Sequence, residues 1–150
     1  MLFRSTEILD RNEVGPADGL RRGGYVLWDS APDPEIALIS TGTEVATTLT
    51  AARSLAGEGT RVRVVSMPCM ELFEAQDSGY RDQVLPPAVT ARLAIEPGSS
   101  MSWWRWVGDH GDVLGLDRFG ASAPGAVVLE KLGFSAENIA ARAQSLLPSS

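Results

Sequence analysis

The sequence predicts an α/β fold of three layers. Helices are expected on both faces of a mostly parallel, about five-stranded sheet with one antiparallel edge strand. Short apolar runs recur along the chain, as expected of strands that are covered on both faces. Segments with helix caps and a helical apolar period separate these runs. This alternation favours parallel pairing, and right-handed crossovers then place helices on both sides of the sheet.

The domain organisation follows from a change in composition near residue 22. The chain has 150 residues, of which 44% are hydrophobic, enough for one domain with its own core. Residues 1–22 are mostly polar and contain the turn signals Gly15-Pro16 and Asp18-Gly19. We therefore expect a linker or extended arm over residues 1–22, not packed as an element, and a folded domain over residues 23–148.

Two strands are predicted at the start of the domain. Residues 25–28 are aromatic and β-branched, which suits an edge strand. Residues 29–34 contain two prolines and two aspartates, which predict a turn. Residues 36–39 form a continuous apolar run, which predicts a strand buried on both faces.

A long helix is predicted directly after this second strand. Thr43 is a candidate N-cap, and Glu44 would interact favourably with the helix dipole. Apolar residues recur at the spacing of one helix face, at Val45, Leu49, Ala52 and Ala56. Gly57 and Gly59 then end the helix.

Three further strands and several shorter helices are predicted downstream. Residues 62–65, 91–95 and 113–116 are short β-branched or apolar runs and predict strands. Residues 71–85 are irregular and polar, which indicates one or two short helices. Residues 102–107 hold three tryptophans and are expected to form a helix.

Two helices are predicted near the end of the chain. Pro124 suits the first turn of a helix that continues to Leu132, with Gly133 as its C-cap. Ser135 is the candidate N-cap of the last helix. Its apolar residues share one face, at Ile139, Ala143, Leu146 and Leu147.

Charge and composition exclude several classes of partner. The net charge of −6 argues against nucleic acid and against an anionic membrane surface. No apolar run reaches the ~20 residues that span a bilayer, and no secretory signal follows Met1. The single cysteine, Cys69, cannot form an internal disulfide, which fits a reducing cytoplasm. We therefore expect a cytoplasmic protein that binds neither nucleic acid nor membrane.

The familiar motifs of catalytic and cofactor sites are missing from the sequence. No glycine-rich dinucleotide turn, phosphate loop, nucleophile elbow or zinc spacing is present. His110 lies beside carboxylates and is a candidate acid–base group, while Cys69 is a candidate thiol nucleophile. A solvated loop histidine and a small buried cysteine are the simpler explanations. We therefore predict no catalytic residue and no metal ligand in this chain.

Two features are candidate binding elements. The loop Thr41, Gly42, Thr43 joins the carboxyl end of a strand to a helix N-terminus, where an anion or another ligand can bind. Glu44 opposes an anion there, so simple capping is the alternative. The cluster Trp103, Trp104, Trp106 could stack on a ligand, but such clusters are typical of interface anchors. We expect these tryptophans to be exposed in the isolated chain and to contact a partner.

A series of short stretches resembles the C-terminal part of transketolase. Their order and spacing hold from Arg22 to Leu147, and together they are more specific than any one of them. The stretches are residues 22–27, 39–45, 64–68, 85–92 with Glu96, 104–108, 119–124 and 133–138.

The resemblance implies a part in two-carbon ketol transfer from a ketose phosphate to an aldose. Transketolases use thiamine diphosphate and Mg²⁺, and the cofactor supplies the carbanion chemistry. A family subunit has a diphosphate-binding domain, a pyrimidine-binding domain and a third domain that this chain resembles. The active sites form between two subunits of a homodimer, away from the third domain. The resemblance thus implies that this chain binds no cofactor itself and works with the other two domains or subunits.

The resemblance extends to one substrate-binding position in the arm. In the family, an arginine at the end of the second domain binds the substrate phosphate, as suits its bidentate geometry. By its distance to Gly23-Gly24, Arg4 falls at that position, although its neighbours depart from the family pattern. Residues 108–111 are the closest match to the thiamine diphosphate signature, but they lack its second glycine and its downstream asparagines.

Three functions remain open from the sequence. The chain is the C-terminal domain or a split component of a transketolase, itself non-catalytic and serving assembly, dimerisation or regulation. Alternatively, it is a stand-alone interaction or ligand-binding module derived from that domain. A third possibility is the equivalent domain of a 2-oxo-acid dehydrogenase, which residues 22–27 and 120–124 disfavour.

Overall fold

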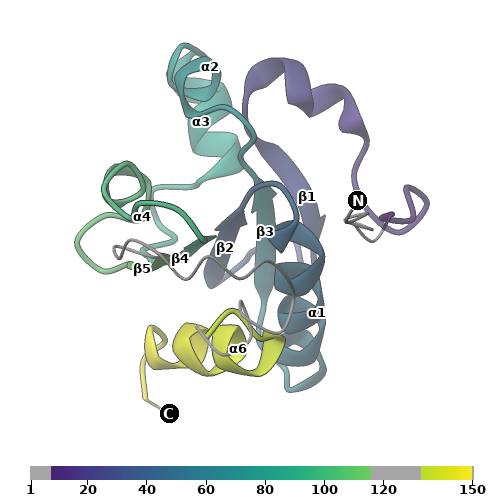
Figure 1. Ribbon diagram of the computed structural model, residues 1–150, viewed down its shortest axis with the longest axis vertical. Helices are drawn as coiled ribbons and strands as arrows, with labels where there is room; N and C mark the ends of the chain where they lie inside the picture. Colours follow the sequence, from purple (N-terminus) through teal and green to yellow (C-terminus); the bar gives the residue numbers. More distant parts are fainter. Residues whose placement is uncertain (1–7, 116–132, 150) are drawn as a thin grey trace, which may run out of the picture.

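The computed structural model describes residues 8–115 and 133–149. Within these ranges five strands form one sheet in the order β1-β3-β2-β4-β5 (Figure 1). β1 at the edge pairs antiparallel with β3, and all other neighbours are parallel, so the predicted sheet is confirmed. The strands are β1 (Tyr25–Asp29), β2 (Ile36–Ser40), β3 (Val62–Ser66), β4 (Ala91–Glu96) and β5 (Asp112–Gly115).

Helices lie close to their predicted places. The segment between β3 and β4 holds two short helices, and the tryptophan-rich segment holds one. The helix predicted over residues 124–132 lies outside the described residues. The described helices are η1 (Ala17–Arg22), α1 (Glu44–Gly57), α2 (Met70–Glu74), α3 (Ser78–Val84), α4 (Trp104–Val107) and α6 (Ala136–Ser145). None of the helices in the described ranges is both long enough and apolar enough to cross a membrane.

The helices cover the two faces of the sheet, which completes the predicted three layers. Along β2, side chains alternate between two core clusters because successive residues of a strand point to opposite faces. Leu38 joins the cluster that contains the apolar residues of α1 and α6. Ile39 joins the other cluster, with Phe73 of α2 and Trp106 of α4. In Figure 1, α1 and α6 lie on one side of the strands and α2, α3 and α4 on the other.

The described part of the N-terminal arm is packed, contrary to the expectation. Val14 is buried in the α1 cluster, and Leu9 packs against the same cluster. The N–H of Gly15 donates to the carbonyl of Leu27 at 2.6 Å, and residues 17–22 form the 3₁₀-helix η1. The residues Gly15-Pro16 and Asp18-Gly19, predicted as turns, thus belong to a segment that precedes the edge strand β1 and contacts it. The domain boundary at residue 22 stays a prediction.

An ion pair between a buried arginine and a partly buried aspartate joins the two strands of the antiparallel edge. Arg63 lies on β3, a strand whose five residues are all buried. Its guanidinium donates twice to the carboxylate of Asp29 on β1, at 2.8 Å each, and its remaining nitrogen donates to the carbonyls of Gln83 and Val84. The buried charge of Arg63 is tolerated because the Asp29 carboxylate neutralises it and all three guanidinium nitrogens donate hydrogen bonds to oxygen atoms.

Candidate functional site

The carboxyl ends of β2, β3 and β4 form the polar edge of the sheet. After β2, the chain passes through α1 and forms β3, which pairs with one edge of β2. β4 pairs with the opposite edge of β2, so the strand order reverses at β2. Such a reversal of strand order leaves a crevice at the carboxyl ends, which is where open α/β sheets bind ligands. We call this region the carboxyl edge and define it by Ser40, residues 41–44, Ser66 and Glu96.

Buried polar side chains are concentrated at the carboxyl edge. Among the described residues, the buried polar and charged side chains are Ser40, Glu44, Thr48, Arg63 and Ser66. Ser40, Glu44 and Ser66 belong to the carboxyl edge, and Ser40 lies opposite Ser66 in the parallel register. The Oγ of Ser40 is fully buried and has no hydrogen-bond partner. An unpaired buried hydroxyl is costly and asks for an explanation.

The loop before α1 has a different geometry from the predicted cap. Thr43 stands at the N-cap position, but it has helical dihedral angles and its side chain makes no capping hydrogen bond. Its hydroxyl instead donates to Oε1 of Glu44 at 2.7 Å. The predicted N-cap position of Thr43 is therefore confirmed, but its side chain does not cap the helix, because its hydroxyl is bonded to the neighbouring carboxylate.

The same contact bears on the predicted ligand loop Thr41, Gly42, Thr43. Glu44 is buried in the first turn of α1, so its own carboxylate supplies the negative charge that the helix dipole favours. A second negative group at this position would meet like charge. The loop geometry thus disfavours an anion, while a role in binding another ligand stays a prediction.

Glu96 adds a second carboxylate to the carboxyl edge. It ends β4, directly after Ile95, which is the register partner of Ser40. Burial raises the pKa of Glu96, and the charge of Glu44 raises it further. Sequence reasoning missed Ser40, Ser66 and Glu96. The sequence does show that each of these three residues directly follows an apolar or β-branched run. It does not show which of these runs lie side by side, because that depends on the strand order.

The tryptophans fall into two groups. Trp103 and Trp106 are buried in the cluster on the α4 side of the sheet, where Trp106 contacts Phe73 at 5.1 Å between ring centroids. The expectation that all three tryptophans are exposed is therefore wrong for these two, because the short helix α4 turns them towards the sheet. Trp104 is 47% exposed, and an interface role for it stays a prediction.

An ion pair involves the residue that follows Trp104 on α4. The guanidinium of Arg105 pairs with the carboxylate of Glu74 at 2.6 Å and so joins α4 to α2. An exposed aromatic residue beside an ion pair is typical of a protein contact surface.

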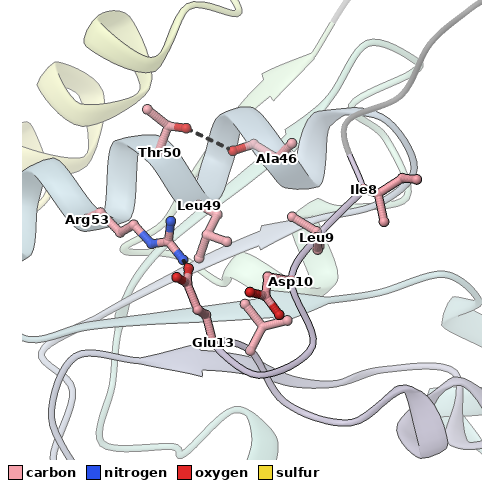
Figure 2. A pocket seen from close by; sticks show the side chains of 9 residues that line it. Ile8, Leu9, Asp10, Glu13, Ala46, Leu49, Thr50 and Arg53 are labelled. Carbon is pink, nitrogen blue, oxygen red and sulfur yellow. Dashed lines mark hydrogen bonds and ion pairs between the residues drawn. The ribbon is translucent and has the colours of Figure 1, made fainter.

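A small pocket lies between the N-terminal segment and α1. It has a volume of about 140 Å³. Figure 2 shows Ile8 and Leu9 beside α1, with Arg53 of that helix reaching Glu13, where the ion pair measures 2.7 Å. Because its charged groups are exposed and paired with each other, we regard this pocket as a packing seam.

The remaining candidates do not gather into a reactive site. The thiol of Cys69 lies 3.5 Å from a carboxylate oxygen of Glu71, and His110 is exposed in the turn before β5. Over residues 8–115 and 133–149, no three His, Cys, Asp or Glu side chains converge as metal ligands. Arg4 lies outside the described residues.

Comparisons with known proteins give consistent results. A family model described as the transketolase-like TK C-terminal domain matches residues 23–135. A transketolase of Nostoc sp. is 50% identical over 130 residues, which cover 87% of this chain and 19% of that protein. A transketolase structure from Leishmania mexicana superposes with a TM-score of 0.78 at 39% identity, covering 86% of this chain and 18% of that one.

A further similar structure is described as a split-gene transketolase, an inactive beta4 tetramer. Its TM-score is 0.62 at 24% identity, and the match covers 85% of this chain and 43% of that one. This likeness shows the fold alone. The chain spans about a fifth of the length of the transketolases of Nostoc and Leishmania.

Proposed function

The chain belongs to the family of transketolase-like C-terminal domains, and we propose that it acts as the C-terminal domain or a split component of a transketolase. The observation that carries this proposal is the extent of the match. It takes in 87% of this chain but only 19% of the Nostoc protein. The complete enzyme would transfer a two-carbon ketol unit between sugar phosphates, and four fifths of it would lie in other domains or subunits.

The described residues do not fit thiamine diphosphate, the cofactor of the complete enzyme. The cofactor's diphosphate is an anion and needs donors or cations around it. The carboxyl edge, where this fold would bind a nucleotide-like group, instead carries Glu44 and Glu96. Like charge would repel the diphosphate there. We therefore propose that the other domains hold thiamine diphosphate with its Mg²⁺, and that this chain alone is inactive.

The proposed role of the chain is assembly with the diphosphate- and pyrimidine-binding domains, within a homodimer. The exposed Trp104, beside the Glu74–Arg105 pair, is the contact candidate on the described surface. The single, unpaired Cys69 favours a cytoplasmic location. The family role favours a place in the pentose phosphate pathway.

Binding to a matched fragment tests this proposal. The fragment would be the Nostoc transketolase, truncated before the region that this chain matches. We expect the chain to bind the fragment in sedimentation velocity, and the emission of Trp104 to shift to the blue as its ring leaves water. A Trp104→Phe variant is the control that assigns the shift. If the chain alone turned over xylulose 5-phosphate and ribose 5-phosphate with thiamine diphosphate and Mg²⁺, the proposal of an inactive component would be wrong.

A stand-alone ligand-binding module is the second candidate function. The observation that favours it is the polar carboxyl edge with the unpaired Ser40 hydroxyl. This candidate predicts no binding to the truncated transketolase, so the same experiment separates it from the first.

A further inference from the structure

The N-terminal segment crosses the edge of the sheet from one layer of helices to the other. Val14 is buried in the cluster that contains α1, on one face of the sheet. Arg22 ends η1, and its guanidinium stacks 4.4 Å from the ring centroid of Tyr80, a residue of α3 that packs against the cluster on the other face. In Figure 1 this segment passes beside β1. We call residues 9–24 the strap.

The strap bonds to the outer edge of β1. β3 pairs with one edge of β1, and no strand of the described residues pairs with the other. The pairing shifts between Val26 and Trp28, so Leu27 has no register partner on β3. The N–H of Gly15 in the strap donates to the carbonyl of Leu27 at 2.6 Å. The strap thus supplies a hydrogen bond where the β-bulge interrupts the ladder.

Two glycines let the strap lie directly against β1. A Cβ added to Gly15 would lie 2.8 Å from the carbonyl oxygen of Val26, and one added to Gly19 would overlap the side chain of Tyr25. A backbone oxygen cannot swing aside as the end of a flexible side chain can. A larger residue at either glycine would therefore push the strap away from the strand.

Each end of the strap is anchored on a different layer of helices. Near its start, the carboxylate of Glu13 pairs with the guanidinium of Arg53 in α1 at 2.7 Å. At its end, the carbonyl of Gly24 accepts a hydrogen bond from the hydroxyl of Tyr80 at 2.8 Å. Because an exposed ion pair contributes little, the buried side chain of Val14 and the close backbone contacts account for most of the docking.

Without the strap, β1 would be an exposed edge strand suited to pairing. Residues 25–28 are aromatic, aliphatic or β-branched and carry no charge, while the charge of Asp29 is paired with Arg63. Natural sheets cover or charge such edges, because another chain can pair with them. A second copy of this chain presents the same edge. Antiparallel pairing about a two-fold axis gives both strands equivalent hydrogen bonds, so β1 fits a second copy of itself.

We propose that the strap is an edge guard. Docked on β1, it keeps this strand from pairing with the β1 of a second copy; released, it exposes the edge and allows a dimer to form. The structure holds the docked state. The position of the N-terminal segment is thereby coupled to self-association. The proposal does not rest on the transketolase assignment, since its readouts use this chain alone.

Trypsin measures release of the strap in the complete 150-residue chain. Arg11 and Arg21 are exposed residues of the strap, and cleavage after them follows the population of its open form. Gly15→Val and Gly19→Val should each raise the rate of cleavage there by about tenfold or more. Gly57→Val is the matched control, because a Cβ at Gly57 meets nothing within 4 Å. It should keep the wild-type rate.

Sedimentation velocity over a range of protein concentrations tests the pairing. We expect Gly15→Val and Gly19→Val to form a dimer whose share rises with concentration and exceeds that of wild type. Gly57→Val should match wild type. Val26→Lys, added to Gly15→Val, should abolish the excess dimer, because a charge on an edge strand opposes strand pairing.

A milder variant keeps the test decisive if Gly15→Val fails to fold, as judged by circular dichroism. Glu13→Arg sets like charges against Arg53 on the surface, so it loosens the strap without touching the core. Across the folded variants, the share of dimer should rise in the same order as the rate of cleavage. The proposal is overturned if no folded variant is cleaved faster than wild type, or if faster cleavage brings no excess dimer. It is equally overturned if the excess dimer persists with Val26→Lys.

Discussion

Arg63 illustrates how single side chains in this fold combine burial with charge. Its side chain is 10% exposed, yet it carries a full charge on a strand that is otherwise apolar or small. Asp29 neutralises it across the antiparallel edge, and two carbonyls take its remaining donors. Removing Asp29 would leave the buried guanidinium without its charge partner, and removing Arg63 would leave the carbonyls of Gln83 and Val84 and the partly buried Asp29 without their donor.

Replacement of Arg63 should therefore be severe. We expect Arg63→Ala to lower the free energy of unfolding by about 3–5 kcal/mol, measured by urea denaturation. Arg105→Ala is the matched control, since it breaks the exposed pair with Glu74 and should cost no more than about 1 kcal/mol. Equal losses in the two variants would show that the Arg63–Asp29 pair is not effectively buried.

The carboxylate of Glu96 should make stability depend on pH. Burial, and then the charge of Glu44, raise its pKa in the folded state, so folding favours the protonated form. The contribution of this raised pKa to the free energy of unfolding is complete below the pKa of the unfolded state, about 4.3. It is lost as the pH rises through the higher pKa of the folded state. Glu96→Gln should remove this loss, so the variant gains stability relative to wild type as the pH rises. Urea denaturation across that pH range measures it, and a constant difference would contradict the assignment.

At the scale of elements, the strands were predictable and the contacts between them were not. Residues 36–39 form a short apolar run, which is typical of a strand buried on both faces, and the structure has β2 there. Ser40, Ser66 and Glu96 are each ordinary at their place in the sequence. Ser40 and Ser66 become neighbours, and Glu96 reaches the same edge of the sheet, only through the order β3-β2-β4, which the sequence pattern does not specify.

The tryptophan-rich segment shows the same limit. The spacing of Trp103, Trp104 and Trp106 is too short for a helical period to reveal which face each occupies. The structure buries Trp103, at the N-cap of α4, and Trp106, and it exposes Trp104. The arm shows the same limit, because Val14 packs in the α1 cluster and Gly15 bonds to distant Leu27, contacts that the local sequence does not reveal.

Two variants of α4 separate core packing from the surface. Trp106→Ala should lower the free energy of unfolding by about 3–5 kcal/mol, as is typical when a large aromatic ring is removed from a core. Trp104→Ala should cost about 1 kcal/mol or less, because half of its surface is exposed. Chemical denaturation followed by circular dichroism measures both, and a larger loss for Trp104→Ala would contradict the orientation of α4.

At the scale of the whole molecule, the described residues form a five-stranded sheet with helices on both faces, and the chain spans about a fifth of the length of its Nostoc relative. Its fold is that of the transketolase-like C-terminal domain, and its carboxyl edge carries the two carboxylates of Glu44 and Glu96. Both observations agree with the proposal that the chain contributes surface to a larger enzyme. The catalytic groups and the substrate phosphate site are proposed to come from elsewhere in that enzyme.

Reconstitution of activity tests this account most directly. The chain is titrated into the truncated Nostoc transketolase fragment, with thiamine diphosphate, Mg²⁺ and the two sugar phosphates present. We predict that turnover, absent or low for the fragment and absent for the chain, rises with the concentration of the chain and saturates near one chain per fragment. Bound chain with no rise in turnover, or turnover by the chain alone, would contradict the account.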